Sequence, residues 1–127
     1  MHLEFLPERN AVVIHDEGEL SGERFGLWLR ELTVDPDFDL DMHQIFDLTH
    51  MTGIPATRPE LEKFVLVAAG FNRGTGRVGV VAPGGLARGL AEAVAAMTTE
   101  QLGRELGVFD SLEDALAWAS AERAAAR

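Results

Sequence analysis

The sequence contains no cysteine, and this absence removes three kinds of chemistry at once. It excludes a disulfide framework, a zinc site built from thiolates and a thiol nucleophile. Long hydrophobic runs are missing as well: the longest, residues 64–69, is far too short to cross a bilayer. The amino-terminal residues lack the basic start, the long apolar stretch and the cleavage site of a secretory signal. We therefore expect a cytoplasmic protein with no membrane span.

Basic residues are scarce relative to acidic ones. The chain has 11 lysines and arginines against 21 aspartates and glutamates, for a net charge of −10. A field of this sign repels phosphate backbones and anionic lipid surfaces. We therefore expect no nucleic acid partner; solubility alone is a sufficient reason for the excess acid.

The length and the hydrophobic patterns predict one α/β domain over residues 1–127. Short apolar runs alternate with amphipathic helical patterns, as in parallel strands joined by crossover helices. Two further runs before the first helix, separated by a turn that begins with Pro7, predict an N-terminal β-hairpin. We expect a mixed, mostly parallel five-stranded sheet and about four helices. The predicted strands are residues 3–7, 11–15, 44–49, 77–82 and 107–109.

Helix boundaries follow from capping residues. Ser21 predicts the start of a helix over residues 22–32, and a loop over residues 33–41 follows it. Thr57 opens the second helix, with Pro59 in its first turn and Glu60 completing a capping box. That helix is apolar on two sides, so either the rest of the domain or a second subunit must cover it. A third helix is expected over residues 86–97, and the last begins after Asp110 or Ser111.

The spacing of the residues does not match several well-known motifs for metal binding or catalysis. The acidic loop 35–41 lacks the glycine and glutamate of a calcium-binding loop in either register, so we interpret its aspartates as solvated turn residues. His2, His15, His43 and His50 show no metal-ligand spacing and are interpreted as structural or surface residues. No serine lies in a nucleophile elbow. We expect no cofactor, no metal and no catalytic residues.

Two glycine-rich segments suggest phosphate loops by composition. Residues 70–76 precede a strand, whereas a phosphate loop follows a strand and opens a helix, so we interpret this segment as a turn. Residues 81–88 do run from a strand into a helix, where backbone amides and the helix dipole favour an anion. The glycines there also suit a plain turn. The candidate anion-binding residues are Gly84, Gly85, Leu86 and Arg88.

The order of elements and four sequence stretches resemble the SpoIIAA-like group related to STAS domains, which include anti-anti-sigma factors. The stretches are ELSGERFGLWLRELTVDPDF, IFDLTHM, RVGVVAPGGLARGL and GVFDSLEDALAWA. With the order of elements, the resemblance covers nearly the full chain. The resemblance implies a central sheet packed by helices, and a role in bacterial regulation or ligand sensing rather than catalysis.

In anti-anti-sigma proteins the loop after the third strand carries a serine that a partner kinase phosphorylates. Here the matching region, residues 47–54, has no serine pair. The nearest hydroxyls, Thr49, Thr52 and Thr57, are the candidate phosphorylation or regulatory residues, since a phosphate near a helix N-terminus is electrostatically tolerated.

The function expected from this resemblance is that of a non-catalytic STAS-like regulatory domain. It would dock a protein partner, or self-associate as a homodimer, through the loop after strand 44–49 and the exposed side of the helix after Thr57. The alternative is a binder of a small apolar or anionic ligand, lipid-like or a nucleotide. An enzyme is not expected.

Overall fold

A computed structural model describes residues 1–19, 22–39, 41–52, 76–82, 89 and 106–121. The expected helices over residues 57–69 and 86–97 lie outside these residues, as do Ser21 and the turn at 83–85. Within the described residues there are two α-helices and one short 3₁₀ helix, where about four helices were expected for the whole chain. No helix in this part of the chain is both long enough and apolar enough for a membrane span.

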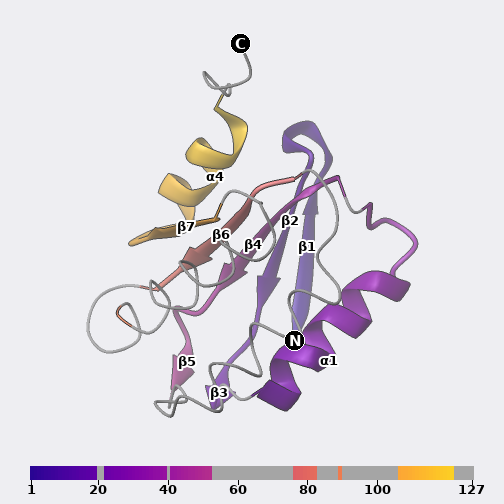
Figure 1. The fold of residues 1–127 in the computed structure, drawn as a ribbon, viewed down its shortest axis with the longest axis vertical. Coiled ribbons are helices and arrows are strands. Elements are labelled where there is room, and N and C mark those ends of the chain that lie inside the picture. Colours follow the sequence, from indigo (N-terminus) through magenta and orange to yellow (C-terminus); the bar gives the residue numbers. More distant parts are fainter. Residues whose placement is uncertain (20–21, 40, 53–75, 83–88, 90–105, 122–127) are drawn as a thin grey trace.

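The main sheet has five strands, as predicted, in the order β1-β2-β4-β6-β7 (Figure 1). β1 pairs with β2 antiparallel, while the β2–β4, β4–β6 and β6–β7 pairs are parallel. Since the hairpin strand at one edge runs against its neighbour, the expected mostly parallel sheet is corrected to a mixed sheet. The strands are β1 (His2–Leu6), β2 (Ala11–His15), β4 (His43–Asp47), β6 (Val78–Val81) and β7 (Leu106–Phe109).

The predicted N-terminal hairpin is confirmed. A single 3₁₀ turn, η1 (Pro7–Arg9), joins β1 and β2, and Asn10 closes it in the left-handed conformation with φ 50°. Asparagine is one of the few side-chain-bearing residues that adopts this conformation at small cost. The turn therefore fixes the register in which His2 lies opposite His15.

A second, two-stranded sheet was not expected. β3 (Gly18–Glu19) pairs in parallel with β5 (Met51–Thr52). Figure 1 shows both strands just beyond the carboxyl ends of β2 and β4. The small sheet thus ties the chain leaving β2 to the chain leaving β4.

Helix α1 (Gly22–Val34) covers one face of the main sheet. Trp28, Leu29 and Leu32 are almost fully buried in a cluster with Val12, Ile14 and Phe46 from the sheet, as their helical spacing predicts. The helix extends two residues beyond the predicted end, and the Asp35 amide donates to the Leu32 carbonyl just before Pro36.

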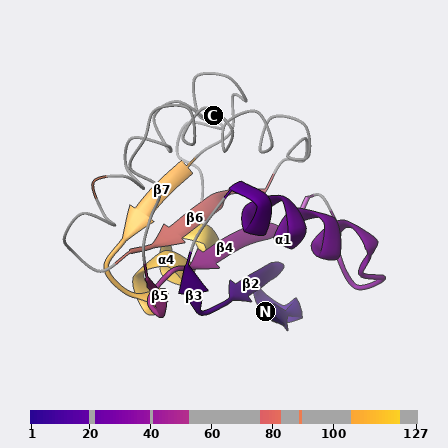
Figure 2. The same ribbon diagram turned by 90° about the horizontal axis from the view of Figure 1, so that it is seen from below.

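Helix α4 (Leu112–Ser120) covers the opposite face, as the end-on view in Figure 2 shows. Ser111 is its N-cap, and the Ser111 side chain accepts a hydrogen bond from the Asp114 amide. Ala115 and Ala119 are buried against Val13 and Ile45 of the sheet. Of the two caps that the sequence left open, the structure therefore has Ser111.

The carboxyl end of α4 is held by a buried arginine. The Arg77 guanidinium donates to the carbonyls of Trp118 and Ala121 and lies 5.4 Å from the centre of the Trp118 ring. A cation at this end complements the partial negative charge of the helix terminus. Trp118 also packs on Phe109, with ring centres 5.1 Å apart.

Candidate functional site

A network of polar side chains lies at the carboxyl ends of the parallel strands. β2 ends at His15 and β4 ends at Asp47, and the two residues are direct partners in the parallel register. In β1, His2 is the register partner of His15. In open α/β sheets this edge is where ligands usually bind, because loops from several strands meet there.

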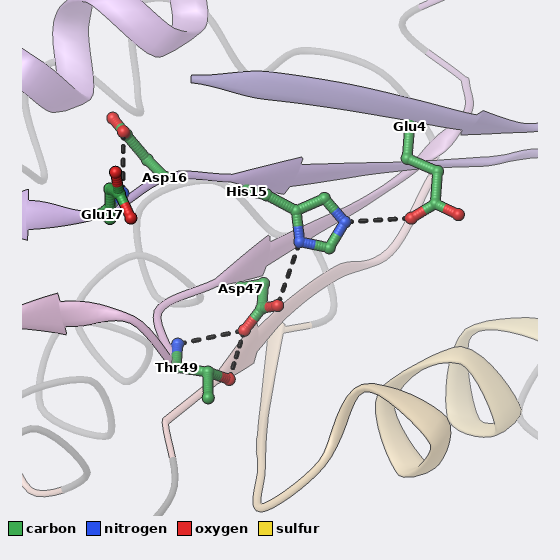
Figure 3. A network of polar contacts seen from close by, with 6 residues as sticks. All are labelled: Glu4, His15, Asp16, Glu17, Asp47 and Thr49. Atoms are coloured by element: carbon green, nitrogen blue, oxygen red, sulfur yellow. Dashed lines mark hydrogen bonds and ion pairs between the residues drawn. The ribbon is translucent and has the colours of Figure 1, made fainter.

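The Asp47 carboxylate joins two neighbouring elements. One oxygen, Oδ2, lies 3.1 Å from His15 Nδ1 in β2. The other, Oδ1, accepts hydrogen bonds from the Thr49 amide at 3.0 Å and from the Thr49 hydroxyl. Figure 3 shows the carboxylate between the histidine ring and the turn. Asp47 therefore ends β4 and fixes the β4–β5 turn, here defined as Leu48 to His50.

This environment favours the ionised form of Asp47. Burial raises the pKa of Asp47, but the hydrogen bonds from Thr49 and from His15 outweigh it and leave the pKa below the usual value. The side chain is only 11% exposed. Asp47 is thus a partly buried carboxylate that stays charged because donors surround it.

His15 is held between two carboxylates. Its Nε2 lies 2.9 Å from Glu4 Oε1, opposite the contact that Nδ1 makes with Asp47. His2 stacks on the same ring, with ring centres 5.8 Å apart. The chain Glu4, His15, Asp47, Thr49 thus crosses three strands and the following turn (Figure 3).

A second partly buried carboxylate, that of Asp16, follows His15 directly in the chain. It accepts hydrogen bonds from Trp28 Nε1 at 2.7 Å and from Arg24 at 3.1 Å, and its Oδ1 lies 3.5 Å from the Met1 amine. Burial raises the pKa of Asp16, but the bonds from Trp28 and the Glu17 amide, together with the two positive charges, lower it below the usual value. Asp16 therefore anchors the start of the β2–β3 loop to helix α1.

An open depression of about 270 Å³ lies between these groups. Its volume is below the usual range for sites that enclose a drug-sized ligand. Among the described residues, no group of three or more histidine, aspartate or glutamate side chains is placed to hold a metal ion. The depression is lined by Met1, His2, His15, Asp16, Glu17 and His50.

Acid should reduce the contribution that the Asp16 carboxylate makes to folding stability. Because the pKa of Asp16 is lower in the folded chain than in the unfolded chain, it adds stability above the unfolded value, which is lost as the pH falls through the folded value. We expect Asp16→Asn to lower the free energy of unfolding by about 1 to 2 kcal/mol at neutral pH. The difference in free energy of unfolding between Asp16→Asn and wild type should shrink below about pH 4. Urea unfolding at a series of pH values measures both quantities.

The matched control for this experiment is Asp37→Asn, because Asp37 is an exposed turn residue. Asp37→Asn should change the free energy of unfolding at neutral pH far less than Asp16→Asn does. A difference between Asp16→Asn and wild type that does not change down to acid pH would show that the Asp16 carboxylate contributes nothing through its charge.

The sequence-predicted regulatory threonines are only partly described. Thr49 is exposed and its hydroxyl is bonded to Asp47, whereas Thr52 lies exposed in β5, two residues beyond the β4–β5 turn. Thr57 lies outside the described residues. The candidate anion-binding residues Gly84, Gly85, Leu86 and Arg88 also lie outside them.

Sequence reasoning missed the role of His15. Treating the histidines as structural suits His43, whose Nδ1 accepts the Arg77 amide at 2.9 Å. It does not describe His15, which bridges two carboxylates. One signal was present: His15 and Asp47 each stand at or near the end of a predicted strand. The predicted strand 44–49 was too long, because the Asp47 side chain captures the Thr49 amide and ends β4.

The acidic loop behaves as predicted. The Asp35 side chain accepts the Asp37 amide at 2.9 Å, and the Asp39 side chain accepts the Asp41 amide at 2.8 Å. Such bonds from a side chain to its own turn are the usual reason for aspartate in loops. Asp37, Asp39 and Asp41 are exposed, so the interpretation as turn residues is confirmed.

Comparison with known proteins supports the fold. No family model and no curated protein matches this chain. A solved structure that does match is that of an uncharacterised DUF3478-family protein from Shewanella loihica PV-4, described as having a SpoIIAA-like fold. The identity is 17%, the match covers 86% of this chain and 82% of that chain, and the TM-score is 0.54. The chain therefore has a SpoIIAA-like α/β fold with a mixed five-stranded sheet, and the resemblance stated from the sequence is confirmed at the level of the fold.

Proposed function

We propose that this protein is a non-catalytic regulatory domain that docks a protein partner at the carboxyl edge of its main sheet. The observation that carries the proposal is the β4–β5 turn, whose residues Thr49 and His50 are exposed while Asp47 fixes the backbone beneath them. A turn already held in one conformation loses little entropy on binding. The bacterial and cytoplasmic setting expected from the sequence is part of this proposal.

The chemistry of the edge favours recognition over catalysis. A hydroxyl nucleophile needs a base that accepts its proton, yet the Thr49 hydroxyl is bonded to Asp47 and not to His15. Both His15 ring nitrogens are engaged by carboxylates. The imidazole therefore has no free nitrogen with which to activate Thr49 in this arrangement.

The negative charge at the carboxyl edge of the main sheet suggests which side chains a partner would carry. Glu4, Glu17 and Glu19 are exposed on β1, in the β2–β3 loop and on β3, and the whole chain carries a net charge of −10. Complementary charge steers encounters and rejects wrong partners. A partner segment with basic or hydrogen-bond-donating side chains fits this surface best.

The threonines near the turn remain candidate regulatory residues within this proposal. A phosphate on Thr49 would lie beside the Asp47 carboxylate, since the two side chains are hydrogen-bonded. Like charges at that distance repel, so modification of Thr49 would open the turn rather than order it. Among the described residues, Thr52 has no hydrogen bond to Asp47 and would meet no such repulsion. Thr57, outside the described residues, stays a candidate.

Photocrosslinking tests the proposal. A benzophenone amino acid placed at His50, on the turn, should capture a protein when the full chain is expressed in the organism it comes from. The matched control is Val34, which is 71% exposed at the far end of α1. A protein-sized adduct from position 50 alone, whether with another protein or with a second copy, is the expected result. Equal adducts from both positions, or none from position 50, would contradict docking at this edge.

The alternative function is binding of a small ligand, and one observation favours it: the depression of about 270 Å³ lined by histidine and acidic side chains. Native mass spectrometry of the purified chain separates the two functions. A copurifying small mass that is lost in His50→Ala would support the ligand, whereas a clean monomer, dimer or protein complex would support docking.

A further inference from the structure

His15 occupies the centre of a three-strand bridge. Its ring connects Glu4 on the edge strand β1 with Asp47 on the inner strand β4, at 2.9 Å and 3.1 Å. The three side chains are unequally exposed: 46% for Glu4, 27% for His15 and 11% for Asp47. Solvent exposure along the bridge therefore falls from Glu4 on β1 to Asp47 on β4.

The number of protons on the ring decides how many of these contacts are favourable. A neutral imidazole has one N–H donor and one acceptor nitrogen, and an ionised carboxylate only accepts. Only the imidazolium, with two N–H groups, can donate to Glu4 and Asp47 together. The neutral ring must leave one carboxylate facing a lone pair.

The surroundings determine which contact is lost. Asp47 is only 11% exposed and is fixed by two hydrogen bonds from Thr49, which hold it against the ring. Glu4 is nearly half exposed and can reach water by a side-chain rotation. A neutral His15 therefore keeps its proton on Nδ1 toward Asp47 and presents an unprotonated Nε2 to Glu4, which must leave.

We propose that the protonation of His15 controls whether the Glu4 carboxylate of the edge strand β1 stays bound to the ring. We call this arrangement the latch. The charged ring holds the Glu4 carboxylate of β1 against β2 while it also donates to Asp47 of β4. Loss of one proton releases the Glu4 carboxylate into solvent and leaves the Asp47 contact in place. The latch is a property of the fold and does not depend on the proposed docking function.

Other charged groups act on the same ring. His2 stacks on it from β1, and a second positive charge there would oppose the charged state. Asp16 and Glu17 line the same depression as His15 and their negative charges favour the charged state, while Arg24 offsets the first by pairing with Asp16. The Met1 amine and His50 also line the depression. Among the described residues, the same end of the sheet further carries Glu19 on β3 and Asp110, Glu113 and Asp114 after β7.

Nuclear magnetic resonance tests the latch on the full chain. Long-range ¹H–¹⁵N spectra of the histidine rings, recorded at about pH 5 and about pH 9, span the range in which histidine side chains change charge. We expect two protonated nitrogens on His15 at the lower pH and the Nδ1–H form at the higher pH. The side-chain carboxyl ¹³C signal of Glu4 should shift in step with the His15 ring.

Two variants make the outcome unambiguous. Glu4→Gln places a group that can donate or accept beside Nε2, so signals of the edge strand should no longer shift with the His15 ring. His2→Gln removes the stacked ring and should leave the coupling intact, which excludes His2 as its source. An Nε2–H form at the higher pH, or a Glu4 signal that ignores the His15 transition, would overturn the proposal.

Discussion

Gly76→Ala is expected to destabilise the fold by about 3 kcal/mol or more. A Cβ added at Gly76 would lie 2.0 Å from the Met42 carbonyl oxygen and 2.4 Å from its carbon, both backbone atoms. Backbone cannot rotate aside as a side chain can, so the chain entering β6 would have to move away from the chain entering β4. Urea unfolding followed by tryptophan fluorescence measures the loss.

The displacement would also break specific contacts. Next to Gly76, the Arg77 amide donates to His43 and the Arg77 carbonyl accepts the Gln44 amide at 2.9 Å. These bonds start the β4–β6 pairing. Gly89→Ala is the matched control, because a Cβ there meets nothing within 4 Å. It should leave stability unchanged or raise it by up to about 1 kcal/mol. Equal stability of the two variants would show that β4 and β6 do not approach each other as described.

Asp47→Ala is expected to cost about 2 to 3 kcal/mol of folding free energy. The change removes the acceptor for His15 Nδ1 and for both donors of Thr49. Hydrogen bonds to a charged group contribute more than neutral ones, and truncation leaves the donors without a partner near a partly buried site. Thermal and urea unfolding at neutral pH give the magnitude.

Asp47→Asn is the informative companion. Its side-chain oxygen can still accept from Thr49, and its amide can donate to a neutral His15, so we expect a cost of about 1 kcal/mol. A loss in Asp47→Asn as large as in Asp47→Ala would assign the stabilisation to the negative charge alone. If neither variant loses stability, Asp47 does not stabilise the site as described.

The framework of the fold was predictable because its signals are local. The hairpin follows from two apolar runs around Pro7, and the helical spacing of Trp28, Leu29 and Leu32 identified the buried face of α1. The small β3–β5 sheet was not predictable, because strands of two residues carry no alternating pattern. The end of β4 was misplaced because a side-chain contact, not the hydrophobic pattern, ends it.

The candidate site was less predictable because its parts are far apart in sequence. His15 and Asp47 meet only through the parallel register of β2 with β4. The sequence indicates that each strand exists but does not indicate the order of strands in the sheet. Glu4 reaches His15 through the hairpin register, which depends on the left-handed Asn10. The turn aspartates, in contrast, bond to neighbours two residues away and were predictable.

The role of Asp47 as the residue that holds the β4–β5 turn is tested most directly by amide hydrogen exchange at Thr49. Thr49 is exposed, and its amide donates to Asp47 Oδ1. We predict that this amide exchanges about tenfold faster in Asp47→Ala than in wild type, the factor expected for a lost bond to a charged acceptor. The His43 amide, which donates to the Asn10 carbonyl at the other end of β4, should change far less. An equal exchange rate for the Thr49 amide in both proteins would contradict the site as described.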